Sequence, residues 1–284
     1  MGTSELQHLI SPRSTIVRPP SSTWPAPAAQ PGDASPATPR IEAAWARHLD
    51  EVREAQRLRH AIFADEMGAR LAPRLPGHDV DLFDDYCEHL LVRDLDSGRV
   101  VGTYRVLTPA QATRVGCTYT DTEFDLRRLR HLRARMVELG RSCVHPGYRQ
   151  GAVIMALWSA LGGFMARNGL DTMLGCASIP MQHRGLHGTV GGGHAAASIW
   201  HQLSQRHLAS PELRVLPRLA LPVEELQHDL DVQPPALIQA YLRMGARVLG
   251  APAWDPDFNT ADLPLLLQLQ DMPARYRRHF LQEA

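Results

Sequence analysis

The chain has 284 residues, with 30 basic and 30 acidic side chains, and 44% of its residues are hydrophobic. This length and composition fit one large folded domain and exclude a disordered or fibrous chain. The neutral charge balance argues against a nucleic-acid partner, and every basic residue is Arg, which excludes a lysine Schiff base and a phosphate-loop lysine.

Residues 1–40 are rich in Pro, Ser, Ala and Thr, a composition that buries too little apolar surface to offset the entropy of ordering. We therefore predict a disordered tail over 1–40 and a folded domain over 41–284. No apolar run reaches the ~18 residues that cross a bilayer. The four widely spaced cysteines form no CxxC pair and indicate reduced thiols, so we expect a cytoplasmic protein, with transient inner-membrane contact left open.

The first folded segment, Glu42 to Met67, contains no Gly or Pro and repeats apolar residues at helical spacing. It predicts one helix that ends at Gly68. Two apolar runs, 87–93 and 99–107, flank an Asp/Ser/Gly turn and predict a β-hairpin. Residues 136–145 predict a further strand.

A helix is predicted to begin at Gly151, because its apolar residues recur at i, i+4 and i+8, and to end at Asn168-Gly169. Beyond it the pattern predicts a strand at 172–179 and helices at 195–208 and 235–244. Two further strands are predicted at 246–249 and 263–269. This mixture of helices and strands indicates an α/β sheet domain.

The junction between the strand at 136–145 and the following helix is the most informative segment. Amides at a helix start lack partners inside the helix, and the helix dipole adds positive charge, so the junction predicts a phosphate cradle without lysine. An ordinary strand–turn–helix connection is the alternative. The donor-binding candidates are Cys143, Val144, Arg149, Gln150, Gly151 and Ala152.

Several segments of the chain resemble known protein families. Arg149-Gln150-Gly151-Ala152 is similar to the Arg/Gln-x-x-Gly-x-Gly/Ala motif of the Gcn5-related N-acetyltransferase superfamily, one residue shorter. Over about residues 55–270 the chain resembles the bacterial ornithine N-alpha-acyltransferases, which are akin to acyl-homoserine-lactone synthases. The blocks that carry this likeness are Phe63–Gly68, Asp84–Val92, Val101–Leu107, Glu123–Leu126, Glu138–Val144 and Gly175–Ser178.

The resemblance implies a Gcn5-related fold, a mixed and mostly antiparallel sheet flanked by helices. It implies transfer of a 3-hydroxyacyl chain from the phosphopantetheine arm of acyl carrier protein to the alpha-amino group of L-ornithine, which gives lyso-ornithine lipid. No other cofactor and no metal are expected. An acyl-homoserine-lactone synthase, a coenzyme A acetyltransferase and a non-enzymatic membrane-active protein are the alternatives.

Glu138 is the candidate base, because a carboxylate on a buried strand has its pKa raised by desolvation. A purely structural pair with Arg141 is the alternative. The segment Tyr241 to Ala246 resembles the Tyr-x-x-x-Gly-Phe stretch of many acetyltransferases, with Ala in place of Phe. This likeness implies that Tyr241 protonates the departing sulfur, and a tyrosine at the edge of the core is the alternative.

Charged residues on neighbouring segments are candidates for binding the amino-acid acceptor. Buried arginines need carboxylate partners, so Arg105 and Arg141 either pair with local acids or clamp the acceptor carboxylate. The loop acids Asp81, Asp84 and Asp85 are the candidate receptors for a cationic amino acid, unless they are simply solvated.

Seven arginines between 127 and 149 predict a basic collar beside the thioester entrance that steers an acidic carrier protein, with a solvated loop as the alternative. His183, His187, His194, His201 and His207 lack acidic or Cys ligands at zinc-like spacing, so we predict no metal site.

Overall fold

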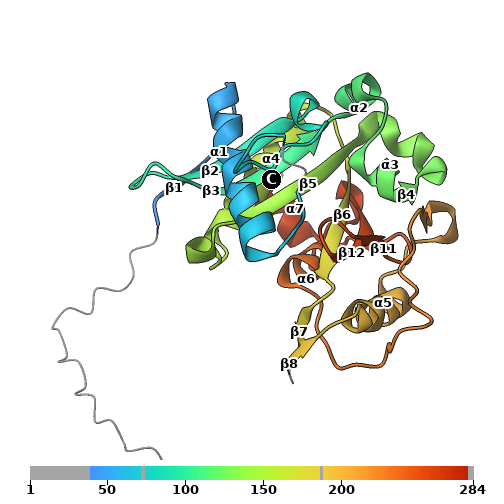
Figure 1. Cartoon of the computed structure of the whole chain (residues 1–284). Helices are drawn as coiled ribbons and strands as arrows, with labels where there is room; N and C mark the ends of the chain where they lie inside the picture. The colour runs from blue at the N-terminus through green and yellow to red at the C-terminus, as the bar shows by residue number, and fades with distance from the viewer. Residues whose placement is uncertain (1–38, 72–73, 186–187, 281–284) are drawn as a thin grey trace, which may run out of the picture. The chain divides into compact units, whose positions relative to one another are not determined.

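Eight strands form the central sheet, in the order β1-β2-β3-β5-β6-β12-β10, and β11 also pairs with β12 (Figure 1). The computed structural model describes residues 39–71, 74–185 and 188–280, so the predicted tail over 1–40 lies almost wholly outside the described residues. The sheet strands are β1 (Ile41–Trp45), β2 (Glu88–Asp94), β3 (Val100–Leu107), β5 (Met136–Val144), β6 (Thr172–Pro180), β10 (Arg247–Val248), β11 (Ala253–Asp255) and β12 (Thr260–Gln268). All neighbouring pairs are antiparallel except β5 and β6, which confirms the mixed, mostly antiparallel sheet.

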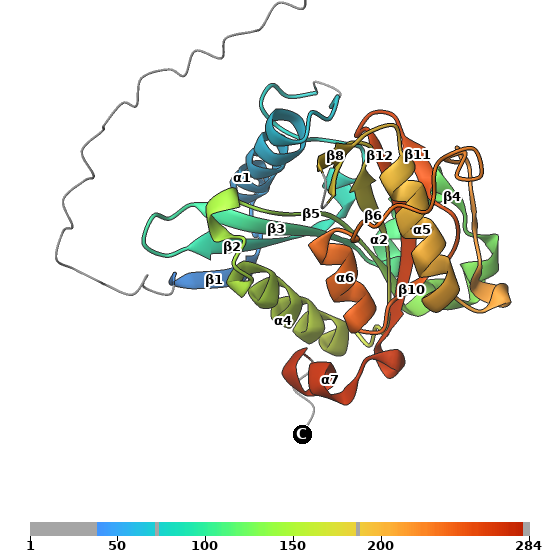
Figure 2. The same ribbon diagram turned by 90° about the horizontal axis from the view of Figure 1, so that it is seen from below.

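Two helices cover opposite faces of the first half of the sheet (Figure 2). Helix α4 (Ala152–Arg167) connects the parallel strands β5 and β6 and packs on β1, β2 and β3. Its buried residues Val153, Leu157 and Leu161 lie four apart and form the stripe that faces the sheet. Helix α1 (Leu49–His60) packs on β3 from the other face and continues into a π-helical turn, Ala61–Glu66.

The prediction of one helix over 42–67 was wrong at its start, because residues 41–45 form the edge strand β1 beside β2. Burial alternates along β1, with Ile41, Ala43 and Trp45 on the inner face. This period of two was present in the sequence, but the alanines do not favour a strand by themselves, and pairing with β2 decides the conformation. The predicted hairpin is confirmed as β2 and β3.

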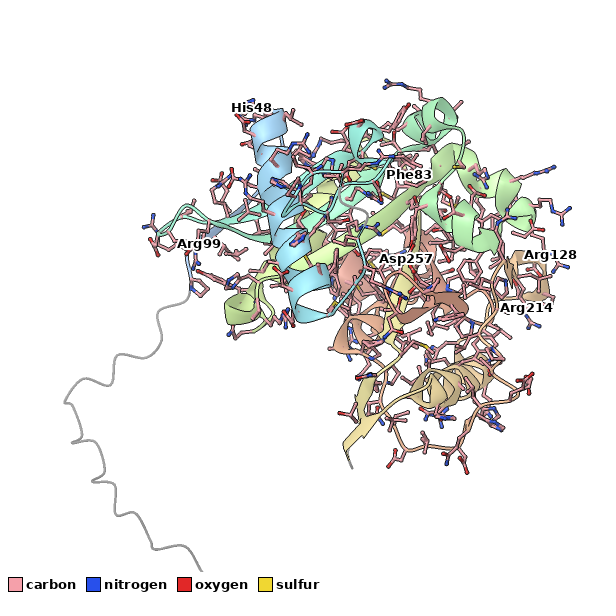
Figure 3. All side chains as sticks on the ribbon, viewed as in Figure 1. His48, Phe83, Arg99, Arg128, Arg214 and Asp257 are labelled. Atoms are coloured by element: carbon pink, nitrogen blue, oxygen red, sulfur yellow. The ribbon has the colours of Figure 1, made fainter. Side chains whose placement is uncertain are left out.

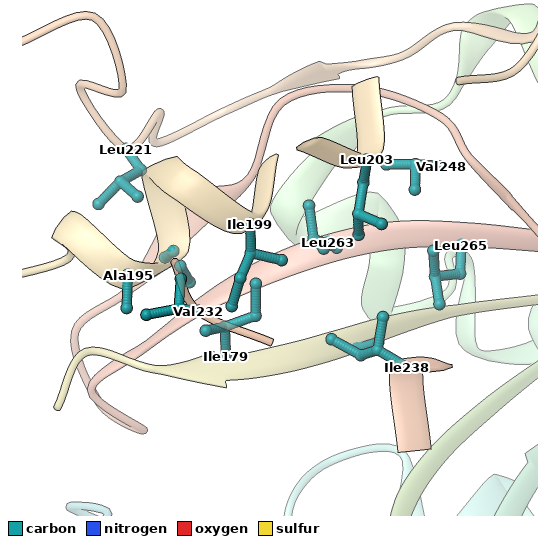
Figure 4. Close-up of a cluster of buried hydrophobic side chains, with 13 residues drawn as sticks. Ile179, Ala195, Ile199, Leu203, Leu221, Val232, Ile238, Val248, Leu263 and Leu265 are labelled. Carbon is teal, nitrogen blue, oxygen red and sulfur yellow. The ribbon is translucent and has the colours of Figure 1, made fainter. Parts of the chain in front are cut away.

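The second half of the sheet has its own core, drawn in Figure 4. Ile199 of α5 (His194–Arg206) and Ile238 of α6 (Ala236–Arg243) belong to one buried cluster with Ile179 of β6 and Leu263 of β12. Helix α7 (Ala274–Phe280) packs against α4. The remaining regular elements are α2 (Pro109–Val115), α3 (Tyr119–Glu123), the pair β4 (Phe124–Asp125) and β9 (Leu216–Pro217), and the pair β7 (His183–Gly185) and β8 (Gly188–Val190).

Candidate active site

Strands β5 and β6 separate in the middle of the sheet. They pair only over Met136–Glu138 and Thr172–Leu174, and beyond these residues each strand continues without the other. At the point of separation a Cβ on Gly175 would stand 2.4 Å from the carbonyl oxygen of Leu139, so only glycine fits there. A cavity of about 900 Å³ occupies the gap. It is lined from one face by Ile62 and Phe63, which follow α1, and from the other by residues of α4.

A β-bulge shapes the β5 side of this gap. Residues 103 and 105 of β3 pair with Cys143 and Gly140, so two residues of β5, Arg141 and Ser142, oppose Tyr104 alone. Arg141 has φ +50°, a left-handed conformation that is uncommon for a residue with a side chain. Bulges redirect side chains. Arg141 and Ser142 both line the cavity as a result.

Three arginines and three aspartates form a buried charge network beside the cavity. Arg59 of α1 donates to Asp79 at 2.8 Å and to Asp84 at 2.8 and 2.9 Å. Arg105 of β3 donates to Asp81 at 2.6 Å. Arg141 donates to Asp79 and Asp81, both at 3.1 Å. Although burial acts to raise it, Arg105 and Arg141 hold the pKa of the Asp81 carboxyl far below its usual range.

Sequence reasoning missed Arg59, which is fully buried and joins two of the aspartates. The surrounding helix is rich in arginine and suggests a solvated face. One signal was available, since Arg59 lies four residues after Ala55 and three before Ile62, on the apolar stripe of the helix.

The loop aspartates predicted to bind a cationic acceptor lie outside the cavity. Asp81 and Asp84 each contact arginine within the network, and Asp85 is exposed. None of the three lines the cavity, whereas Arg105 and Arg141 do. Asp81 and Asp84 therefore hold the two arginines at the cavity wall, and Asp85 does not contribute.

Glu138 lies at the closed end of the gap and lines the cavity, with 6% of its surface exposed. Its carboxylate accepts hydrogen bonds from the amides of Tyr119 and Thr120, at 2.7 and 2.6 Å, and from the Thr120 hydroxyl at 2.6 Å. It therefore holds the first turn of α3 and forms no ion pair with Arg141 among the described residues. Burial raises the pKa of Glu138, and these hydrogen bonds oppose the rise.

Tyr241 of α6 reaches the cavity from the opposite side. Its hydroxyl hydrogen-bonds the hydroxyl of Tyr104 in β3, and the Ser142 hydroxyl interacts with both phenols. Burial raises the pKa of Tyr104 to about 12 and, together with the Tyr104 contact, raises that of Tyr241 well above 10. Both phenols therefore keep their protons at neutral pH. Tyr104 was not predicted, since nothing in the local pattern distinguishes it from a core residue.

The segment predicted as a phosphate cradle precedes α4 and contributes to the cavity lining. Gly151 has φ +104° and precedes the first turn of α4, whose free amides have no side-chain cap. Arg149 donates from both terminal nitrogens to Glu66, at 2.7 and 2.8 Å, and both side chains line the cavity. Cys143, Val144 and Gly151 line it too, while Gln150 and Ala152 are exposed outside it. Burial raises the pKa of the Cys143 thiol to about 12, which leaves it a poor nucleophile.

One part of the cavity lining is apolar. Its wall is built from α4, β12 and the C-terminal helices, with Trp158, Leu161, Leu267, Met244, Met272 and Phe280 among its side chains. A wall of this chemistry fits a hydrocarbon chain.

The seven arginines between 127 and 149 do not form one collar. Those of the 3-10 helix Arg127–Arg135 precede β5, and Arg149 follows it, so the length of the strand separates them. Arg128, labelled in Figure 3, lies far from the turn at 146–151. Three arginines of the first group are paired, with Asp125, Asp121 and Asp171.

The predicted absence of a metal site involves His187, which lies outside the described residues. Among the residues that are described, no group of three or more His, Cys, Asp and Glu is placed to hold a metal ion. In the same part of the chain, no helix combines the length and apolar character that crossing a membrane requires.

A sheet that opens between two parallel strands, with a helix start at the mouth and an apolar arm inside, defines an N-acyltransferase of the GNAT class. Residues 58–159 match the family model described as an acetyltransferase (GNAT) domain. The L-ornithine N(alpha)-acyltransferase of Rhodobacter capsulatus is 36% identical over 251 residues, 83% of this chain and 92% of that protein. The L-ornithine N(alpha)-acyltransferase of Brucella abortus is 32% identical, over 86% of this chain and 90% of that protein. The chain belongs to the L-ornithine N(alpha)-acyltransferase family.

Among solved structures, the match to the acyl-homoserine-lactone synthase LasI has a TM-score of 0.49 and 12% identity, and it covers 87% of this chain and 98% of that chain. The coenzyme A-dependent synthase BjaI, solved with isopentyl-CoA, has a TM-score of 0.48 and 19% identity, and covers 86% and 87%.

Proposed function

We propose that the protein transfers a 3-hydroxyacyl chain from acyl carrier protein to the alpha-amino group of L-ornithine and so forms lyso-ornithine lipid. The cavity in the split sheet carries this proposal, because it joins a helix-start cradle, an apolar arm and two fixed arginines in one space. The names of the relatives supply the amino acid and the position of the acylated nitrogen.

The donor occupies the cradle and the apolar arm. The phosphodiester of the phosphopantetheine arm lies at the first turn of α4, where free amides favour an anion. Of the residues predicted to bind the donor, Gly151 and Arg149 contact the phosphodiester, and Cys143 and Val144 lie beside the pantetheine arm. The acyl chain extends into the apolar part, against Trp158 of α4.

The acceptor carboxylate binds Arg105 and Arg141, since a guanidinium matches a carboxylate in charge and geometry. Asp81 and Asp84 serve this site through the arginines that they hold. Their ion pairs fix the orientation of each guanidinium before the acceptor arrives, which reduces the entropy lost on binding.

The reaction is attack of the alpha-amine on the thioester carbonyl. Glu138, directly or through one water, takes a proton from the amine as the C–N bond forms, and its raised pKa suits that task. The C–S bond then breaks, and the Tyr241 hydroxyl donates its proton to the thiolate. Glu138 then releases its proton to water and Tyr241 regains one from water, which restores both groups. The products are the amide and the carrier thiol.

Two exposed methionines at the cavity wall, Met67 and Met155, are 40% and 36% exposed. They offer apolar surface near the mouth, which supports transient contact with the inner membrane when the lipid product leaves.

The deciding experiment incubates the purified protein with L-ornithine and either a 3-hydroxyacyl carrier protein or the matching acyl-coenzyme A, and reads the products by mass spectrometry. We expect N-alpha-acylornithine with the carrier donor. Acylation of the side-chain nitrogen, efficient use of the coenzyme A donor alone, or no ornithine product would contradict the proposal.

A further inference from the structure

Two further carboxylates line the cavity on strands that the predicted site did not include. Asp255 ends β11 and Asp262 lies on the neighbouring β12, and they are 6% and 3% exposed. Asp255 accepts a hydrogen bond from the Tyr119 hydroxyl at 3.1 Å. Asp262 accepts one from the Thr260 hydroxyl at 2.9 Å. Glu123 of α3 is half-buried nearby, and both aspartates act on its titration.

These acids differ from those of the arginine network in one respect. Asp79, Asp81 and Asp84 each contact at least one guanidinium, whereas among the described residues no Arg or His lies within ion-pair distance of Asp255, Asp262 or Glu123. Burial, reinforced by Asp255, raises the pKa of Asp262 to about 6. A buried negative charge without a cation is costly, and a cationic ligand would remove that cost.

Tyr119 connects this acidic wall to the arginines. The guanidinium of Arg141 stands 5.1 Å from the centre of the Tyr119 ring, while the hydroxyl of the same ring bonds Asp255. Asp255 also accepts from the backbone amides of Asp257 and Phe258, and the charge of Arg141 acts to lower the pKa of Asp262. The pair is thus hydrogen-bonded but has no ion-pair partner among the described residues, and Tyr119 connects it to Arg141. That arrangement matches the two charged ends of a short basic amino acid whose alpha-amine is left free to react.

We propose that Asp262 and Asp255 bind the side-chain ammonium of the acceptor and so select a cationic amino acid. This inference rests on the proposed function and identifies the group that reads the acceptor side chain. It moves the cation receptor from the loop at 81–85 to the β11–β12 wall.

The test compares L-ornithine with L-norvaline, which has the same carbon skeleton without the side-chain amine, as acceptors for one acyl-carrier donor. We expect Asp262→Asn to lower kcat/KM for ornithine by roughly 30-fold or more, because a buried charge pair is lost, and to leave norvaline nearly unchanged. Asn keeps an oxygen that accepts from Thr260. Asp257→Asn is the matched control, since Asp257 lies in the turn between β11 and β12, is exposed and does not line the cavity, and it should alter neither value.

Equal losses for ornithine and norvaline in Asp262→Asn would overturn the inference while leaving the proposed function intact. No acylation of ornithine by the unaltered protein would instead overturn the proposed function. A second measurement needs no variant: ornithine without donor should raise the Tm of the unaltered protein more than norvaline does. Equal shifts of Tm would also overturn the inference. Asp255→Asn should reproduce the selective loss if Asp262→Asn does not fold.

Discussion

The six residues of the buried network carry equal numbers of positive and negative groups, and every aspartate contacts two arginines. Burying six charges is stabilising only when each is compensated, so removing one partner leaves an unpaired charge in the core. The arrangement explains how two guanidinium groups remain oriented at a mostly apolar cavity. The Arg141 guanidinium also stacks on Phe258, at 4.6 Å from the ring centre, which fixes it further.

Glu138 both holds α3 and is the proposed base, and the two roles separate experimentally. We expect Glu138→Gln to lower kcat by at least about 100-fold, because proton transfer is lost, while the protein still folds. Thr120→Val removes a donor to the same carboxylate without removing the carboxylate, so it should cost less activity. If both variants lose activity only in proportion to their fall in Tm, Glu138 acts by holding the helix.

Tyr241 is expected to supply the proton for the leaving thiolate. Tyr241→Phe should lower kcat by roughly 100-fold with a pantetheine thioester. When the leaving thiol has a low pKa, its thiolate departs without being protonated. The variant should therefore lose much less kcat with such a thioester. An identical loss with both donors would assign Tyr241 to packing against Trp158, with which it makes a ring contact.

Asp262 predicts a pH-dependent stability in the absence of substrate. Its pKa is raised from 3.8 to about 6 in the folded protein, so the folded state binds its proton more tightly than the unfolded state. Its stabilising contribution is complete below about pH 4 and is lost as the pH rises through about 6. Asp262→Asn should therefore raise Tm relative to the unaltered protein at pH 7.5 but not at pH 4, and equal differences at both pH values would contradict this.

At the scale of elements, β5 and β6 approach each other closely at Gly175, directly after the last residue pair that joins them. Gly175→Ala places a methyl group 2.4 Å from a backbone oxygen, so a strand must shift. We expect a loss of about 1–3 kcal/mol in the free energy of unfolding, measured with denaturant. Gly191→Ala is the control, because nothing lies within 4 Å of its added methyl group. A stability equal to that of the control would show that the strands tolerate a wider junction.

The regular elements with strong periodicity were predictable, and the short ones were not. The hairpin, β5, α4 and β6 follow from apolar runs bounded by turn residues, so local sequence fixes them. The edge strand β1 and the five-residue helix α3 have only weak local signals, a short alternation in β1 and a Thr118–Asp121 capping box in α3, and contacts with β2 and Glu138 complete them.

The same division holds for the candidate site. Glu138, Arg105, Arg141 and the cradle lie in predicted elements, and the structure brings them to one cavity. Tyr104 also lies in a predicted strand, next to Arg105, but its role was not predicted. Arg59 acts behind the cavity wall through the aspartates, and the acids of β11 and β12 reach the cavity from a distant part of the chain. Only the sheet order, which places β12 next to β6, brings the latter there. Pairing with local acids was one of the two expectations for Arg105 and Arg141, and the structure confirms it for Arg105 and Asp84. The pairs with Asp79 and Asp81 were not predicted, because they depend on elements that meet only in the folded chain.

At the scale of the whole molecule, a formal charge of zero conceals separate charged regions. If the exposed arginines Arg128 and Arg130 attract an acidic carrier protein, added salt should raise the KM for the acyl-carrier donor, because charges on the surface are screened beyond ~8 Å at physiological ionic strength. The KM for the small donor acyl-pantetheine should not change. A carrier KM that is independent of salt would exclude steering by these residues.

The parting of β5 from β6 also has a mechanical consequence. Only three residue pairs join the two halves of the sheet across its centre, with α4 as the covalent bridge. This narrow seam of the sheet borders the cavity, and under the proposed function a donor whose hydrocarbon tail fills the cavity would extend the hydrophobic core while it is bound. Amide hydrogens on either side of the seam should exchange more slowly once the donor is loaded, so that occupancy and rigidity rise together.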